Sequence, residues 1–168
     1  MKTALLPSLL ISALALLSAC QTPPPVAWQK LTLEQSKPIL VEVHDGDGVR
    51  EHGEKVFFEA KLKDPAGQVT AQMLGMMVIV DLPGNDGVGD PAVEERFTWV
   101  SVIFPEGDEI VVQGANIYPA GQTIMKPQAA QARAIVGGTG KFKGIRGQVV
   151  TTRNPDETYT HTLEYRLD

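Results

Sequence analysis

No segment of this chain repeats its apolar residues every 3.6 positions over three turns, and this lack of helical patterning constrains the fold most. Short segments rich in β-branched residues alternate instead with turns supplied by 16 Gly and 12 Pro. Eight antiparallel strands without helices favour a small closed barrel, which leaves no strand edge unpaired, and an open sandwich is the alternative. The predicted strands are 39–44, 55–63, 68–82, 96–104, 109–114, 129–136, 145–153 and 158–167.

The composition limits the class of protein. The chain has 168 residues, of which 43% are hydrophobic, so it suffices for one compact domain and is too apolar to be disordered. Its 15 Lys and Arg against 20 Asp and Glu give a net charge of −5, which argues against a nucleic-acid partner. The single cysteine excludes an intrachain disulfide and a zinc–thiolate cluster. We therefore expect an all-β protein with neither a metal ion nor a cofactor.

The first 19 residues read as a targeting signal that is not part of the fold. Lys2 precedes an apolar stretch over residues 4–17, which is too short for a relaxed transmembrane span of ~20 residues. Leu17-Ser18-Ala19-Cys20 then resembles a bacterial lipobox, which implies cleavage before Cys20 and lipidation of its sulfur. The alternative is an ordinary signal followed by a buried free cysteine.

The lipobox implies a membrane partner through the lipid anchor. The residue after the cysteine is Gln21 and not Asp, which by similarity to Gram-negative lipoproteins favours the outer membrane, with the domain in the periplasm. Residues 20–38 are interpreted as the lipidated cysteine and a tether, because the proline run at 23–25 favours extended geometry. The barrel domain is expected to span residues 39–168.

The most specific motif is the glycine-rich segment 134–149 (AIVGGTGKFKGIRGQV). It closely resembles the strand–turn–strand signature of plant allene oxide cyclases and dirigent proteins, and the upstream segment 110–114 (IVVQG) resembles the strand that precedes that signature. This resemblance implies an eight-stranded antiparallel barrel with a central cavity, in a family whose members are commonly homotrimers.

The residues of the motif independently favour a tight structural corner. Its glycines permit positive φ and close backbone approach, and Phe142 could plug the corner from inside. A phosphate-binding loop is disfavoured, because Gly140-Lys141 is followed by Phe142 and not by Ser or Thr.

The first predicted strand carries the candidate catalytic residues. By resemblance to allene oxide cyclases, Glu42 occupies an acidic position in the cavity and His44 replaces an Asn. Dirigent proteins carry a His-Asp pair at this strand instead, which His44-Asp45 resembles. Glu42 and His44 are two residues apart and therefore share one strand face. If this face is the lumen, the two groups could act as acid and base on a small apolar substrate, with Asp45 as a ligand-binding residue. The alternative is an exposed Glu42 with His44 as a hydrogen-bonded neighbour, and Asp45-Gly46-Asp47-Gly48 as an ordinary turn.

The last predicted strand supplies two further candidates. His161 shares a strand face with Tyr159, Leu163 and Tyr165. Tyr159 and His161 are candidate ligand-binding residues, and the alternative is an inward-facing histidine satisfied by hydrogen bonds.

Three functional hypotheses follow. The favoured one is an outer-membrane-anchored lipoprotein whose barrel binds a small apolar ligand or a partner protein in the periplasm, without chemistry. The second is a cofactor-free isomerase or cyclase that uses Glu42 and His44. The third is a structural envelope protein whose barrel is packed solid.

Overall fold

The computed structural model describes residues 27–43, 52–81, 90 and 92–168, and all of their regular structure is β-strand except for one 3₁₀ turn, η1 (Gly140–Phe142). No helix in this described part is long and apolar enough to cross a membrane. The signal segment and Cys20 lie outside the described residues. The strands are β1 (Gln29–Gln35), β2 (Ile39–Val43), β3 (Lys55–Lys63), β4 (Val69–Asp81), β5 (Val93–Ile103), β6 (Glu109–Pro119), β7 (Gln131–Gly138), β8 (Ile145–Arg153) and β9 (Tyr159–Leu167).

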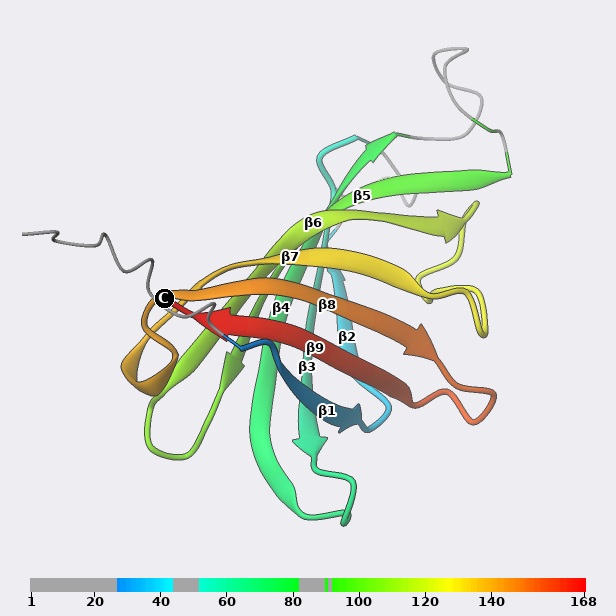
Figure 1. Cartoon of the computed structure of the whole chain (residues 1–168). Helices are drawn as coiled ribbons and strands as arrows, with labels where there is room; N and C mark the ends of the chain where they lie inside the picture. Colours follow the sequence, from blue (N-terminus) through cyan, green and yellow to red (C-terminus); the bar gives the residue numbers. More distant parts are fainter. Residues whose placement is uncertain (1–26, 44–51, 82–89, 91) are drawn as a thin grey trace, which may run out of the picture.

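The strands close into a barrel, as the sequence predicts (Figure 1). Every neighbouring pair is antiparallel, in the order β1-β9-β8-β7-β6-β5-β4-β3-β2, and β1 also pairs with β3 through Glu34↔Lys63 and Gln35↔Leu62. This contact closes a ring of eight strands. The ninth strand, β2, pairs with the remaining part of β3 from Ile39↔Glu59 to Val43↔Lys55. The all-β, closed eight-stranded antiparallel fold is thus confirmed over the open sandwich.

The ring contains a strand that the sequence analysis assigned to the tether. Residues 29–35 form β1, which pairs with β9 along its whole length, so the tether expected over 20–38 does not extend through this part. Leu33 and Gln35 are both buried. The strand was overlooked because one of its inward positions is glutamine, which weakens the apolar alternation that identifies a strand.

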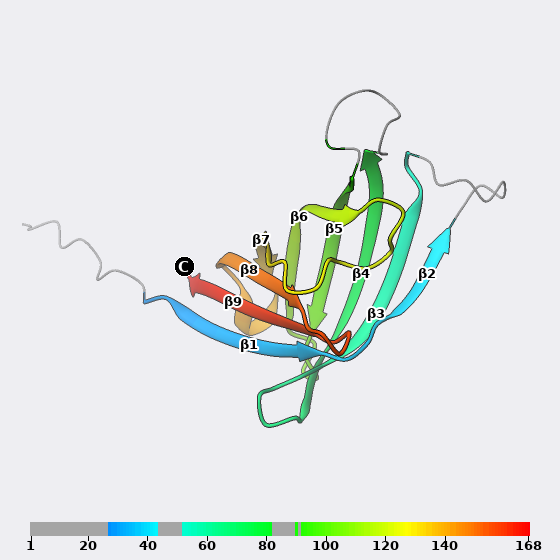
Figure 2. The ribbon, with the colours of Figure 1, turned by 90° about the vertical axis from the view of Figure 1, so that its right-hand side faces the viewer.

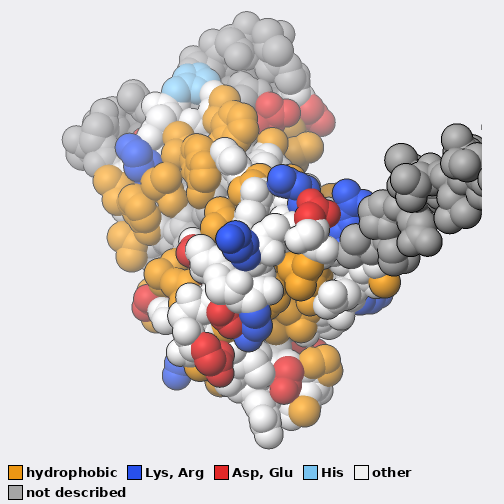
Figure 3. All heavy atoms as spheres, turned by 60° about the vertical axis from the view of Figure 1, so that its left-hand side comes forward, with side chains coloured by type: hydrophobic (Ala, Val, Ile, Leu, Met, Phe, Trp, Pro, Cys, Tyr) orange, Lys and Arg blue, Asp and Glu red, His pale blue; other side chains and the backbone are white. Residues whose placement is uncertain are grey.

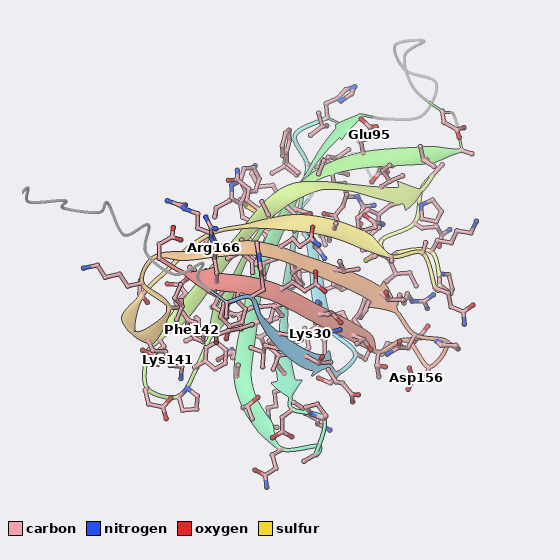
Figure 4. All side chains as sticks on the ribbon, in the orientation of Figure 1. Lys30, Glu95, Lys141, Phe142, Asp156 and Arg166 are labelled. Atoms are coloured by element: carbon pink, nitrogen blue, oxygen red, sulfur yellow. The ribbon has the colours of Figure 1, made fainter. Side chains whose placement is uncertain are left out.

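One end of the barrel is apolar and closed by the glycine-rich corner. Phe142 of η1 is buried, and its ring lies 4.9 Å from that of Phe104 and 6.3 Å from that of Tyr165. Gly140 has a φ of 56°, in the region that favours glycine. The predicted corner and its phenylalanine plug are confirmed, and Figure 4 shows Phe142 at the opposite end of the barrel from Asp156.

The other end is crossed by the segment 120–130, which links β6 to β7 and lies across the mouth in Figure 2. Its backbone is held from inside the barrel, because the Arg96 guanidinium donates to the carbonyl of Gln122 at 2.5 Å and to that of Thr123 at 3.4 Å. The amide of Gln128 donates to the carbonyl of Arg153 at 2.9 Å. Met125, which belongs to this mouth segment, is buried.

The outer surface carries its own apolar area (Figure 3). Outward positions on β2 to β5 line up across the sheet in one row, Val41↔Phe57, Phe57↔Met76 and Met76↔Trp99. Val41, Phe57 and Trp99 are exposed. The barrel therefore has two separate apolar regions, one inside and one outside.

Candidate functional site

A cavity lies inside the barrel between the closed corner and the mouth segment. The volume that the centre of a water molecule can reach is about 60 Å³, which is room for roughly four waters. Most of the wall is apolar and comes from opposite strands, including Leu33, Phe58, Met73, Val100 and Leu163. The polar side chains of the wall are Gln35, Tyr118, Thr123, Arg133, Thr151, Tyr159 and His161. An apolar enclosure with a few convergent polar groups is the usual form of a small-molecule site.

Four of these polar residues form one chain of hydrogen bonds across β7, β8, β9 and β1. Arg133 Nη2 donates to Thr151 Oγ1. Thr151 Oγ1 lies 2.9 Å from His161 Nδ1, and His161 Nε2 lies 2.8 Å from Gln35 Oε1. Because arginine can only donate, Thr151 Oγ1 accepts the bond from Arg133 and donates its own proton to His161 Nδ1. His161 then carries its proton on Nε2 and donates it to Gln35. The chain orients all four side chains and fixes the tautomer of His161.

His161 is held in its neutral form. Burial, together with the nearby positive charge of Arg133, lowers its pKa from 6.5 to about 3. Both nitrogens of this neutral imidazole are hydrogen-bonded, so His161 serves to position the side chains beside it. It is a poor proton donor at neutral pH.

The two cavity tyrosines also stay neutral. Burial raises the pKa of Tyr118 to about 12 and raises that of Tyr159 as well. The Tyr118 hydroxyl donates to the sulfur of Met77 at 3.0 Å, which is a weak acceptor.

The buried arginines differ in their partners. Arg96 and Glu94 are each 1% exposed and paired, with Arg96 Nε 2.5 Å from Glu94 Oε1. Arg153 pairs with Glu157 at 3.3 Å. Arg133 is 9% exposed and has no carboxylate partner among the residues that the structure describes. Burial lowers the pKa of Arg133, because a guanidinium loses hydration there.

The structure places three of the five predicted catalytic and ligand-binding residues. Tyr159 and His161 line the cavity from β9. Glu42 is half-buried on β2 and accepts a hydrogen bond from Thr123 Oγ1 of the mouth segment, so it lies at the mouth and not in the cavity wall. His44 and Asp45 lie outside the described residues, so no geometry is assigned to the expected pair with Glu42.

Sequence reasoning missed Arg133, Thr151, Gln35 and Tyr118 as cavity residues. One signal was available for Arg133, because in β7 it shares the inward face with buried Ile135. Gln35 and Tyr118 lie in segments that were predicted to be tether and loop. Within the described residues, no group of three or more His, Cys, Asp or Glu is placed to hold a metal ion.

Comparison with known proteins identifies the fold. No family model and no curated protein matches the chain. Among solved structures it is similar to a pyocyanin demethylase, with 14% identity over 83% of this chain and 99% of that one and a TM-score of 0.58. It is also similar to a nonspecific heme-binding cyclase that catalyses a [4 + 2] cycloaddition during neoabyssomicin biosynthesis, with 20% identity over 88% of this chain and 66% of that one and a TM-score of 0.62. The Diels–Alderase AbmU from Streptomyces koyangensis gives 20% identity, 85% and 64% coverage and a TM-score of 0.62.

These likenesses define a class by its fold. The chain shares its antiparallel barrel fold with these proteins, and it spans about two thirds of the length of the heme-binding cyclase chain and of the Diels–Alderase chain. The narrower resemblance of residues 134–149 to allene oxide cyclases and dirigent proteins stays a prediction. At these identities the likeness concerns the fold and leaves the activity open.

Proposed function

We propose that this protein is a lipid-anchored protein of the bacterial outer membrane whose barrel binds a small apolar molecule on the periplasmic side. The observation that supports binding is the cavity: a closed barrel with a mainly apolar lumen and a few oriented polar groups. An interior packed solid, as in a purely structural barrel, would lack this space. The lipobox at Cys20 supports the anchor.

Entry of a ligand involves the mouth segment. The free space of about 60 Å³ is small, and the segment contributes Thr123, Ile124 and Met125 to the cavity wall. A ligand larger than a few waters therefore displaces Ile124 and Met125 as it enters. The bonds from Arg96 to the carbonyls of Gln122 and Thr123, and from Thr123 to Glu42, attach the mouth segment to the barrel, and such a displacement would break some of them.

The methionines offer a direct test. Met73, Met77 and Met125 line the cavity, whereas Met76 lies on the outward face of β4 beside Trp99. With ¹³C-methyl methionine in the Cys20→Ala chain, titration with toluene should shift the three cavity signals saturably and leave Met76 unmoved. Shifts confined to Met76 would mean that toluene binds the outer apolar surface, and an absence of saturable shifts would reject the cavity as a binding site.

A cofactor-free isomerase or cyclase is the second candidate. It is supported by the inward position of Glu42 beside Thr123 at the cavity mouth, and by the description of two structural neighbours as a cyclase and a Diels–Alderase. Glu42→Gln removes the acid with little change of shape. If the barrel is an enzyme, this variant should keep toluene binding and lose turnover of a substrate that the wild type converts. Equal turnover by both proteins would exclude Glu42 as the acid.

A further inference from the structure

We infer that the cavity selects small apolar molecules that carry a carboxylate, and that Arg133 is the residue that binds this carboxylate. The inference rests on the proposed ligand-binding function and names the ligand class for the same cavity. It follows from four observations on Arg133 and its surroundings.

The first observation is that Arg133 is buried and incompletely bonded. Its guanidinium lines the cavity from β7, and Thr151 Oγ1 is its hydrogen-bond partner in the structure. Arg133 Nε is buried and has no hydrogen-bond partner among the described residues. A buried donor without an acceptor is unfavourable, so this atom is poised to bond to an incoming acceptor.

The second observation is the unbalanced charge. Arg96 is paired with Glu94 and Arg153 with Glu157, but no carboxylate in the described part of the chain faces Arg133. The other titratable groups at the cavity wall, Tyr118, Tyr159 and His161, are neutral at pH 7. A buried charge is tolerated when it is paired, and a ligand carboxylate would complete this pair in the bidentate geometry that arginine favours.

The third observation is that neighbouring residues make room for Arg133. Gly114 on β6 lies beside its stem, and a Cβ atom at Gly114 would come within 2.9 Å of Arg133 Cγ. Thr151 accepts one of its N–H groups and is itself held through His161 and Gln35. The guanidinium is therefore pre-oriented, which reduces the entropy lost when a ligand binds.

The fourth observation concerns the rest of the ligand. Tyr118 interacts electrostatically with Arg133, and among the described residues the hydrogen-bond partner of its hydroxyl is the weak acceptor Met77 Sδ. The hydroxyl can therefore turn to donate to a carboxylate oxygen. Most of the remaining wall is apolar, with Leu33, Val100 and Leu163 among its members. Such a wall favours a hydrocarbon body over a hydrated inorganic anion.

The test compares ligands that differ only in charge. Hexanoate and hexanamide, and benzoate and benzamide, are titrated into the ¹³C-methionine-labelled Cys20→Ala chain. We expect the wild type to bind each acid at least about tenfold more tightly than its amide, because charge-assisted hydrogen bonds are the stronger ones. Arg133→Met should abolish this preference while retaining the amides, and Arg133→Lys should retain part of it.

The matched control is Arg153→Met, which removes a buried arginine that is absent from the cavity wall, although it contacts the wall residue Tyr159. Its Nε, like that of Arg133, has no hydrogen-bond partner among the described residues, but its guanidinium is already paired with Glu157. Arg153→Met should leave the preference for acids unchanged. Competition with inorganic phosphate separates the ligand class from a general anion site, and phosphate should not displace hexanoate.

The outcomes separate this inference from the proposed function. Equal affinity of the wild type for acid and amide would overturn the inference and leave the binding barrel intact. Failure of all four compounds and of toluene to bind would reject the binding function itself. Displacement of hexanoate by phosphate, or loss of the preference in Arg153→Met, would also overturn the assignment to Arg133. The wild-type comparison stands even if Arg133→Met fails to fold.

Discussion

Gly140 occupies a constrained backbone position at the barrel's closed end. Its φ of 56° places it where other residues are strained, and the carboxylate of Asp108 fills the space beside it. Asp108 Oδ1 accepts the amide of Lys141 at 3.1 Å, and Asp108 Oδ2 lies 3.0 Å from Lys141 Nζ. The Asp108 side chain, from the β5–β6 turn, thus holds the backbone of the corner in place.

We predict that Gly140→Val destabilises the barrel by about 3 kcal/mol, because it adds backbone strain and a steric clash at once. A Cβ atom at this position would lie 1.8 Å from Asp108 Oδ1. Urea unfolding measures the difference. Gly137→Ala is the control, since a Cβ there meets nothing within 4 Å and should have a much smaller effect. A loss below ~0.5 kcal/mol for Gly140→Val would show that the corner tolerates ordinary residues.

His161 should make the stability of the protein depend on pH. Its pKa is about 3 in the folded state and 6.5 when unperturbed, so below pH 6.5 the unfolded chain binds a proton that the folded chain refuses. The contribution of neutral His161 to the free energy of unfolding is therefore fully present above pH 6.5. It declines as the pH falls towards 3, by at most about 1.4 kcal/mol per pH unit.

The measurement is the free energy of unfolding at pH 7 and at pH 5, where the carboxylates with lowered pKa, such as Asp108 and Asp156, are still ionised. The wild type should lose stability between these two pH values. His161→Gln, which cannot be protonated, should lose less, although it starts from a lower value at pH 7. Parallel curves for both proteins would contradict a buried neutral His161.

At the scale of elements, β1 decides whether the sheet becomes a closed ring. It pairs with β9 over seven residue pairs, from Gln29↔Tyr165 to Gln35↔Tyr159, and meets β3 at its end. Leu33 is 1% exposed within the core. Without β1, the edges of β9 and of one end of β3 would be open to pairing with other chains.

We therefore predict that a chain beginning at residue 39, the boundary expected from the sequence, does not form a stable barrel, whereas one beginning at residue 27 does. Losing buried Leu33 alone is comparable to a Leu-to-Ala change of about 2–5 kcal/mol, a large share of a typical domain stability of about 5–15 kcal/mol. Amide proton NMR and thermal unfolding distinguish the two chains. Equal melting temperatures would mean that β1 is dispensable.

The elements that sequence reasoning predicted well are those whose information is local. The corner at Gly140 and Phe142 was predicted because a run of glycines between two β-branched segments has few alternative structures. β1 was missed, and the end of β6 beyond Gly114 was predicted as loop, because buried polar residues such as Gln35 and Asn116 interrupt the apolar alternation. Gln35 bonds to His161, which is 126 residues away in the chain, so this partner could not be predicted from the sequence alone. For the same reason, the sequence could not show that Arg133 lies in the cavity without a carboxylate partner among the described residues.

At the scale of the whole molecule, the start of β1 shortens the proposed tether. With Gln29 already in the barrel, nine residues from Cys20 to Trp28 would separate the lipid from the fold. Fully extended they span at most about 30 Å. A lipidated Cys20 would therefore keep the barrel close to the membrane surface.

We predict that Cys20→Ala moves the protein from the membrane fraction to the soluble fraction of a bacterial envelope. The basis is Leu17-Ser18-Ala19-Cys20, and mass spectrometry of the mature wild-type N-terminus should show a lipid-modified cysteine. Ser18→Thr, which keeps the cysteine, serves as a mild control and should remain membrane-bound. A soluble wild-type product that begins at another residue would contradict the anchor.

The pairing of β1 with β9 has a consequence for the order of events during biogenesis. Most of the residue pairs of β1, the first strand, are with β9, the last strand. The ring therefore cannot close until the whole chain is present. Such distant pairings form slowly, because two far-apart segments must lose conformational entropy in coming together before their contacts can stabilise the fold. The β1–β9 pairs can therefore form only after β9 has been synthesised. For a chain that is exported before it folds, this delay keeps it in a form that can still be threaded through a membrane.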